Sequence, residues 1–175
     1  MKKTLIAAAA VLAATATAQA DDKVFDGGYV GGELGYTDAG DGVNGAYFGA
    51  FGGYRKQNDS GLVYGIEGTF GKTSADLTAG GIKFDDVYDR EWTVMGTLGT
   101  VVGESKRTLL YVGAGFVQQK ASISYGGYSE SATGESYVVS AGFERALGEN
   151  MSLRLRASTY EFEIASVALG LGFRF

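Results

Sequence analysis

The sequence predicts an all-β fold, an eight-stranded antiparallel up-and-down transmembrane β-barrel, from its carboxyl terminus and its composition. Residues 165–175 alternate without a break, so one face of a strand is apolar and the other is small or polar. The apolar face carries Ala165, Val167, Leu169, Leu171, Phe173 and Phe175. The chain has 29 Gly, 11 Tyr, 10 Phe and no Pro, which disfavours helices and suits strands joined by turns. A barrel wall needs such strands, with lipid outside and a polar lumen inside.

The amino-terminal segment has the three parts of a secretory signal peptide. Lys2 and Lys3 form a basic start, residues 5–14 are apolar, and Ala18-Gln19-Ala20 supplies a cleavage pattern. The apolar stretch is too short for a membrane-spanning helix, which needs about 20 residues. We therefore expect residues 1–20 to be cleaved and residues 21–175 to form one outer-membrane β-barrel domain, exported through the periplasm.

The composition argues against several classes of function. The chain has no cysteine and no histidine, so disulfides, the commonest zinc and haem ligands and the usual catalytic base are missing. The formal charge of −5 becomes −7 once Lys2 and Lys3 are removed, which is not the basic signature of nucleic-acid binding. We expect no catalytic residues, no cofactor, no metal and no nucleic-acid partner.

Eight alternating segments follow the signal peptide, each about as long as the 9–11 residues that a tilted strand needs to cross a bilayer. They run over residues 29–37, 46–55, 62–70, 91–101, 109–118, 136–145, 152–160 and 166–175. The connections alternate in length. Residues 56–61, 103–107 and 147–150 predict short periplasmic turns, whereas residues 73–90 and 119–135 predict long outer loops. The outward connections 38–45 and 161–165 are shorter.

The charged residues decide which face of each strand meets lipid. Arg154 and Arg156 share one face of the seventh segment, and turning them outward near the bilayer midplane costs roughly 2–4 kcal/mol each. They must therefore face the lumen. The same test gives an inward ion-pair cluster of Glu33, Arg55, Glu67, Glu144, Arg154, Arg156 and Arg174. It leaves apolar residues such as Leu34, Ile66 and Val112 facing lipid.

With that phase, the outward aromatic residues fall at the strand ends, as two membrane girdles require. The loop side carries Tyr36, Phe48, Phe70, Trp92, Phe116 and Tyr137, and the turn side carries Tyr54, Tyr64, Phe143, Phe173 and Phe175. An eight-stranded barrel is just wide enough for side chains to fill it, so a wide pore is disfavoured. The charged cluster then acts chiefly as a stabilising core, with a gated ion or proton path as the alternative.

Three stretches resemble the small outer-membrane β-barrel family that includes the opacity-protein-like porins and the OmpA membrane domain. Residues 27–36 resemble its first strand, residues 111–116 its fifth strand, and residues 169–175 its carboxyl-terminal signal. The resemblance implies that Leu169, Leu171, Phe173 and Phe175 are read by the barrel-assembly machinery. The resemblance to OmpA ends at Phe175 and does not include a periplasmic peptidoglycan-binding domain, so we do not expect peptidoglycan anchoring.

The function predicted from these features is a non-enzymatic outer-membrane β-barrel that contributes to envelope integrity and displays surface loops. Its expected partners are outer-membrane lipid and lipopolysaccharide, the barrel-assembly machinery, and a host or other surface ligand bound through the loops. The two long loops carry acidic and aromatic residues: Asp76, Phe84, Asp85, Asp86, Tyr88, Asp89, Tyr125, Tyr128, Glu130 and Glu135. A narrow channel or porin for ions or small solutes is the alternative, and a lipid-modifying enzyme or a soluble periplasmic ligand-binding barrel is less well supported.

Overall fold

The structure is a computed structural model that describes residues 23–38, 44–79, 82–84, 88–125 and 128–175. Within these ranges, the side chains of residues 75–89 and 121–131 are outside the described set. The predicted signal peptide lies outside the described residues, and so do most of the predicted loop side chains. Among the described residues, no helix is long and apolar enough to cross a membrane.

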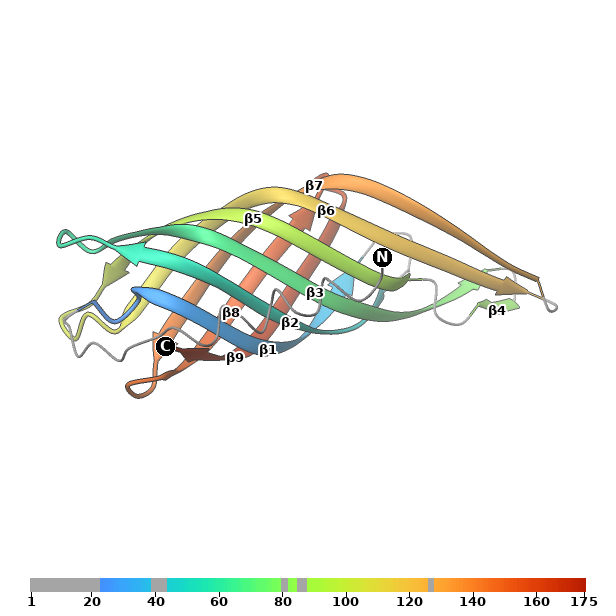
Figure 1. Ribbon diagram of the computed structural model, residues 1–175. Coiled ribbons are helices and arrows are strands. Elements are labelled where there is room, and N and C mark those ends of the chain that lie inside the picture. Colours follow the sequence, from blue (N-terminus) through green and yellow to red (C-terminus); the bar gives the residue numbers. More distant parts are fainter. Residues whose placement is uncertain (1–22, 39–43, 80–81, 85–87, 126–127) are drawn as a thin grey trace.

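The described chain forms one closed antiparallel sheet, which confirms the predicted up-and-down barrel (Figure 1). The strands are β1 (Gly27–Asp38), β2 (Asn44–Gln57), β3 (Leu62–Ala79), β4 (Ile82–Phe84), β5 (Tyr88–Val102), β6 (Thr108–Tyr125), β7 (Tyr128–Ala146), β8 (Met151–Tyr160) and β9 (Ile164–Arg174). Each strand of the wall pairs with its neighbour in sequence, and β1 also pairs with β9. The short β4 pairs with β3 outside this ring, so the wall has eight strands.

The two ends of the barrel differ. The turns at residues 58–61, 103–107 and 147–150 lie at one end, together with the carboxyl terminus, and we call this the turn end (Figure 1). Glycines at positive φ, Gly61 at 84° and Gly103 at 82°, allow two of these turns to be tight. The opposite end, which we call the hairpin end, carries the longest strands.

The two stretches predicted as long loops are largely β-structure instead. β3 continues to Ala79 and pairs with β4, and β6 and β7 pair continuously as far as Tyr125 and Tyr128. The serines and glycines of residues 119–135 favour a loop, but the antiparallel ladder satisfies every backbone group that it pairs. The β6–β7 hairpin therefore extends beyond the rest of the wall in Figure 1.

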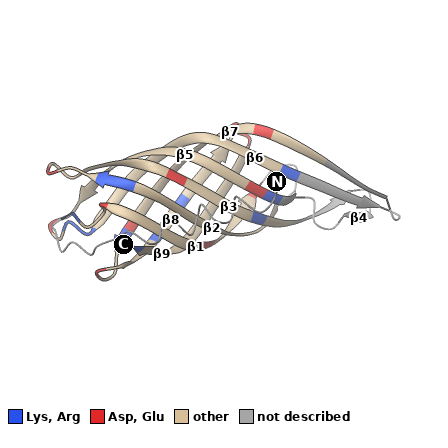
Figure 2. Cartoon of the chain, viewed as in Figure 1, with Lys and Arg blue, Asp and Glu red and all other residues tan. Residues whose placement is uncertain are grey.

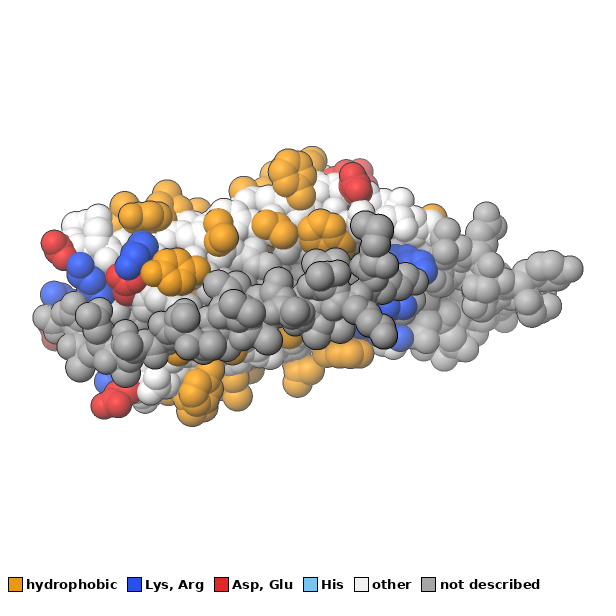
Figure 3. Space-filling model, viewed as in Figure 1, with side chains coloured by type: hydrophobic (Ala, Val, Ile, Leu, Met, Phe, Trp, Pro, Cys, Tyr) orange, Lys and Arg blue, Asp and Glu red, His pale blue; other side chains and the backbone are white. Residues whose placement is uncertain are grey.

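Side chains alternate between the two faces of the wall with period two. In β9, Ser166, Ala168 and Gly170 are buried, whereas Val167 and Leu169 are more than half exposed. The same holds for the predicted lipid-facing positions elsewhere, with Leu34 70% and Ile66 66% exposed. Figure 3 shows hydrophobic side chains protruding along the middle of the visible face, with charged side chains toward its ends. The wall thus has an apolar perimeter.

Candidate functional site

The interior of the barrel holds an ion-pair network, which we call the lumen network. Arg154 on β8 donates from Nη2 to Glu67 Oε1 on β3, at 2.6 Å, although β3 and β8 are not neighbours in the sheet. Arg156, two residues further along β8, pairs with Glu33 on β1, and its Nη1 lies 3.6 Å from Glu67 Oε1. All four side chains are buried. The Arg154–Glu67 pair therefore joins opposite walls across the barrel axis, whereas the Arg156–Glu33 pair spans the one strand, β9, that lies between β8 and β1.

A third ion pair lies nearer the turn end. Arg55 on β2 makes two hydrogen bonds to Glu144 on β7, from Nη1 to Oε2 at 2.9 Å and from Nη2 to Oε1 at 2.7 Å. This bidentate geometry is the strongest arrangement for an arginine and a carboxylate. Figure 2 shows acidic and basic positions within the strands of the wall as well as at its ends.

Tyrosine hydroxyls add hydrogen bonds to the lumen network. Tyr29 donates to Glu67 Oε2 at 2.8 Å, and Tyr47 donates to Glu33 Oε1 at 3.1 Å. Arg154 Nε donates to the Tyr111 hydroxyl at 2.5 Å. These bonds satisfy further acceptors and donors of Glu67, Glu33 and Arg154, and such additional bonds help buried ion pairs to offset their desolvation.

One aromatic contact and one further carboxylate belong to the same interior. The guanidinium of Arg154 lies 4.4 Å from the ring centroid of Phe51. Toward the hairpin end, Tyr160 donates to Glu91 Oε1 at 2.9 Å, and Gln119 Nε2 donates to Glu91 Oε2. The sequence analysis did not assign Glu91 or these tyrosines to the cluster. Their positions in the period-two alternation face inward, so the alternation could have identified them.

Arg174 is buried with the others but is held differently. Its guanidinium donates to the backbone carbonyl oxygens of Val24, Gly148, Glu149 and Met151, at 2.5 to 3.1 Å. It was predicted as a member of the ion-pair cluster. The hydrogen bonds place it instead as a clamp between the last strand, the β7–β8 turn and the segment before β1.

That segment closes the turn end of the barrel. Phe25 is completely buried, its backbone N–H donates to Gln57 Oε1 at 2.9 Å, and its ring lies 5.1 Å from the Arg55 guanidinium and 5.5 Å from that of Arg174. Before it, Lys23 pairs with Asp59 at 2.7 Å, and this hydrogen bond lowers the pKa of the exposed Asp59 carboxyl. Residues 23–26 therefore form a plug, which we call the Phe25 plug.

Little open space remains in the described interior. A cavity of about 10 Å³ lies beside Tyr29, Arg55, Glu67 and Tyr111, which is room for about one water molecule. Four buried polar atoms, Glu33 Oε2 and one nitrogen each of Arg154, Arg156 and Arg174, have no hydrogen-bond partner within the described chain. No cluster of three potential metal ligands occurs among the described residues. This geometry suits a rigid polar core.

Glycines make room for the lumen network. A Cβ on Gly142 would lie 2.2 Å from Tyr111 Cζ, so the tyrosine that accepts from Arg154 packs flat against the β7 backbone there. We predict that Gly142→Ala lowers the free energy of unfolding by about 1–3 kcal/mol, because the methyl group displaces Tyr111. Gly96→Ala is the matched control, since only one atom lies within 4 Å of its Cβ position. Urea unfolding of both variants checks this prediction. Equal losses of stability in the two variants would contradict it.

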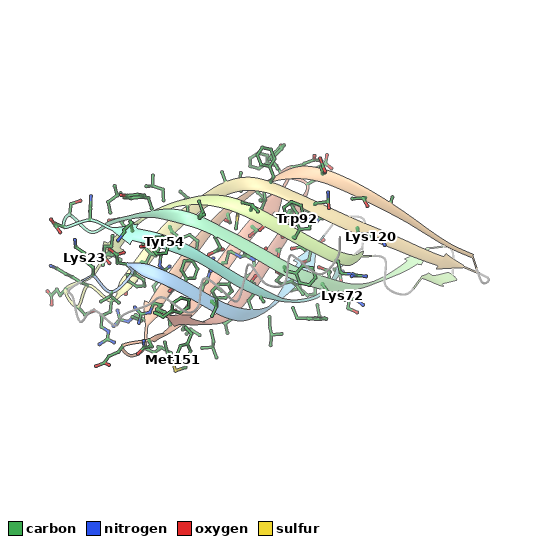
Figure 4. The ribbon with its side chains drawn as sticks, in the orientation of Figure 1. Lys23, Tyr54, Lys72, Trp92, Lys120 and Met151 are labelled. Carbon is green, nitrogen blue, oxygen red and sulfur yellow. The ribbon has the colours of Figure 1, made fainter. Side chains whose placement is uncertain are left out.

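The predicted girdle residues are exposed on the outer face of the wall. They are Tyr36, Phe48, Tyr54, Tyr64, Phe70, Trp92, Phe116, Tyr137 and Phe143, and Phe116 is 75% exposed. Phe70 and Trp92 are directly paired across β3 and β5, and Trp92 Nε1 donates to Gln118 Oε1 at 3.0 Å. In Figure 4, Trp92 lies toward the hairpin end and Tyr54 toward the turn end.

The four residues of the predicted assembly signal lie on the outer face at the seam of the barrel. Leu169, Leu171 and Phe173 are each more than half exposed. Phe175 exchanges two backbone hydrogen bonds with Gly28, so the β1–β9 ladder continues to the last residue. Recognition of these side chains by the assembly machinery stays a prediction.

A closed antiparallel wall with an apolar perimeter and a charged, hydrogen-bonded interior defines a transmembrane β-barrel of the outer-membrane type. Residues 6–175 match the family model described as outer membrane protein beta-barrel domain, and the chain belongs to that family. No curated protein matches the sequence.

Solved structures of other barrels share the fold. Ail, the attachment invasion locus protein of Yersinia pestis, solved with the heparin analogue sucrose octasulfate, is 21% identical with a TM-score of 0.58, covering 85% of this chain and 96% of Ail. The N-terminal β-barrel domain of Pseudomonas aeruginosa OprF is 16% identical with a TM-score of 0.57, covering 84% and 97%. Neisserial surface protein A is 15% identical with a TM-score of 0.54, covering 85% and 96%. At these identities the likeness is one of fold.

Proposed function

We propose that this protein is a non-enzymatic component of the bacterial outer membrane that reinforces the envelope and presents its hairpin end as a contact surface. The observation that carries the proposal is the interior. Three ion pairs, their tyrosines and the Phe25 plug occupy the described lumen, and the cavity beside Tyr29 and Glu67 has room for about one water molecule. Its outer wall and its projecting strands are the surfaces that remain available to partners.

The β6–β7 hairpin supports the contact role. Its strands pair from Thr108–Arg145 as far as Tyr125–Tyr128, well past the aromatic residues that mark the membrane boundary, so it forms a stiff projection. Long connections on a rigid scaffold are where binding usually resides. The Ail structure contains a sulfated heparin analogue, but the acidic residues of this chain's hairpin end favour a cationic partner or one bridged by divalent cations.

Shortening this hairpin tests the contact role. We predict that replacing residues 121–132 by Asn-Gly leaves the barrel folded, because Lys120 and Thr133 are directly paired and a two-residue turn can close that pair. Cells carrying this variant should lose adhesion to the partner surface, measured as cell binding to immobilised host matrix. They should keep resistance to hydrophobic dyes, which cells lacking the whole protein lose.

Heat-modified gel migration of the shortened variant is the folding control. Unchanged adhesion by a folded variant would contradict the contact role, and unchanged dye exclusion in cells without the protein would contradict the envelope role.

A further inference from the structure

Three basic side chains face outward side by side, just beyond the aromatic residues at the hairpin end. They are Lys72 on β3, Arg90 on β5 and Lys120 on β6, and we call them the basic row. Arg90 and Lys120 are directly paired. The β3–β5 ladder ends at the pair Gly71–Glu91, and Lys72 and Arg90 are the next residues of the two strands beyond it. The row therefore crosses three neighbouring strands at one level.

The row lies on the outer face of the barrel. Lys72 is paired with the exposed Phe48, and paired residues share a face. Arg90 is two residues from Trp92, and Lys120 is four residues from Phe116, so both share the phase of an outward aromatic residue. Figure 4 shows Lys72 and Lys120 on the hairpin side of the wall near Trp92, and Figure 3 shows basic side chains beyond the apolar belt.

The height of the row matches the phosphate layer of a membrane. Outward aromatic side chains sit at the level of the lipid headgroups, and Phe70, Trp92 and Phe116 mark that level on the same three strands. Each residue of a strand rises about 3.3 Å. The basic row thus begins about 7 Å further along the strands from Phe70 and Trp92, where a tilted strand leaves the hydrocarbon.

The charges of the row favour an anion. Directly paired side chains have Cβ atoms about 4.5–5.5 Å apart, and like charges at that distance repel each other. Lys72 and Arg90 each also make an interaction within the protein. Of the described acids nearby, Glu91 faces the lumen and bonds to Tyr160, and the exposed Glu135 accepts from Gln118. A phosphate bridging the row would relieve the repulsion through charge-assisted hydrogen bonds.

We propose that Lys72, Arg90 and Lys120 form a binding site for the phosphate groups of an anionic lipid in the leaflet at the hairpin end. The proposal deepens the envelope role proposed above and rests on it, because anchoring charged lipid around the wall is one way in which a barrel reinforces a membrane. The chemistry required is a phosphorylated headgroup at the interface, as in a phosphorylated glycolipid or an anionic phospholipid.

The test measures lipid retention by the purified full-length protein. Wild type and Lys72→Gln/Arg90→Gln/Lys120→Gln are placed in nanodiscs of phosphatidylcholine alone, with phosphatidylglycerol, or with lipid A, and bound lipid is counted by native mass spectrometry. We expect wild type to retain both anionic lipids over phosphatidylcholine, less so at high salt. The triple variant should lose roughly 100-fold in apparent affinity, because each basic residue near an anionic surface contributes about fivefold.

A matched triple variant at the other end, Lys23→Gln/Lys56→Gln/Lys106→Gln, removes the same charge and should retain lipid like wild type. Wild-type retention by the basic-row variant would overturn the proposal. So would saturation of the row by inorganic phosphate without any preference for lipid.

The hairpin-shortened protein keeps all three residues of the row. It should retain lipid A even if the contact role fails, so the two proposals fail separately.

Discussion

Replacing Arg154 by Leu is expected to lower the free energy of unfolding by about 3–5 kcal/mol, because it removes the nearer counter-ion of the buried Glu67 and leaves only Arg156, whose Nη1 lies 3.6 Å away. Arg154 is 1% exposed and pairs with Glu67, which is 2% exposed. The substitution also removes the donor to the Tyr111 hydroxyl and the cation above the Phe51 ring. Urea unfolding of the barrel in detergent or lipid measures the loss. Gel migration without boiling gives the fraction that is still folded at each urea concentration.

A second substitution separates the effect of the unbalanced Glu67 charge from the effect of lost packing. In Arg154→Leu/Glu67→Gln the glutamine is neutral and still accepts from the Tyr29 hydroxyl, so the double variant should be more stable than Arg154→Leu alone. Lys56→Gln is the control for loss of a positive charge at the surface. Its ion pair with Asp26 is exposed at the lysine end, and such surface pairs contribute little to stability. An Arg154→Leu barrel as resistant to urea as wild type would show that the lumen network does not stabilise the fold.

The face of each strand that points into the lumen could be predicted, because the charged residues of one strand showed how to decide it. Arg154 and Arg156 cannot face hydrocarbon, and period two then assigns each side chain of β8 to a face. Applied to the other strands, the same rule places Leu34 outside and Glu67 inside, where the structure has them. Period-two alternation is a property of each strand alone, so it can be recognised in the sequence without knowing which strands pair.

The partners inside the lumen were not predictable in the same way. Which arginine meets which glutamate depends on the stagger between strands on opposite walls, and β3 and β8 are far apart in sequence. Arg174 was expected among carboxylates, but the carbonyl groups of the turn between β7 and β8 accept its hydrogen bonds instead. Nothing in the alternation distinguishes a lysine or arginine that meets a carboxylate from one that meets carbonyl oxygens.

The strand extensions at the hairpin end were not predicted from the sequence, for a related reason. Residues 119–135 contain serine and glycine at the frequency of a loop, and a strand that needs no lipid-facing side chains loses the apolar half of its alternation. Only the continuous pairing of β6 with β7 identifies it as a strand. The basic row lies where this change in composition begins, so it too is recognised only once the register is known.

Phe25→Ala is expected to lower the free energy of unfolding by about 3–5 kcal/mol, the usual cost of emptying a fully buried aromatic site. The ring is completely buried and packs with Val63, Leu109, Tyr111 and Ala146. It also lies against the guanidinium groups of Arg55 and Arg174, at 5.1 and 5.5 Å. Alanine would remove the aromatic ring that both cations contact, so the loss includes two cation–π contacts as well as a cavity.

The single tryptophan gives a clean readout of this loss. Trp92 lies toward the hairpin end (Figure 4), far along the barrel from Phe25, so its fluorescence reports unfolding of the wall and not release of the plug. Trypsin cleavage after Lys23 reports release of the plug itself. Phe25→Leu fills part of the site without a ring, and its loss should fall between wild type and alanine. If Phe25→Ala speeds cleavage but leaves the urea midpoint unchanged, the plug docks on a wall that is stable without it, and its proposed contribution to the fold is wrong.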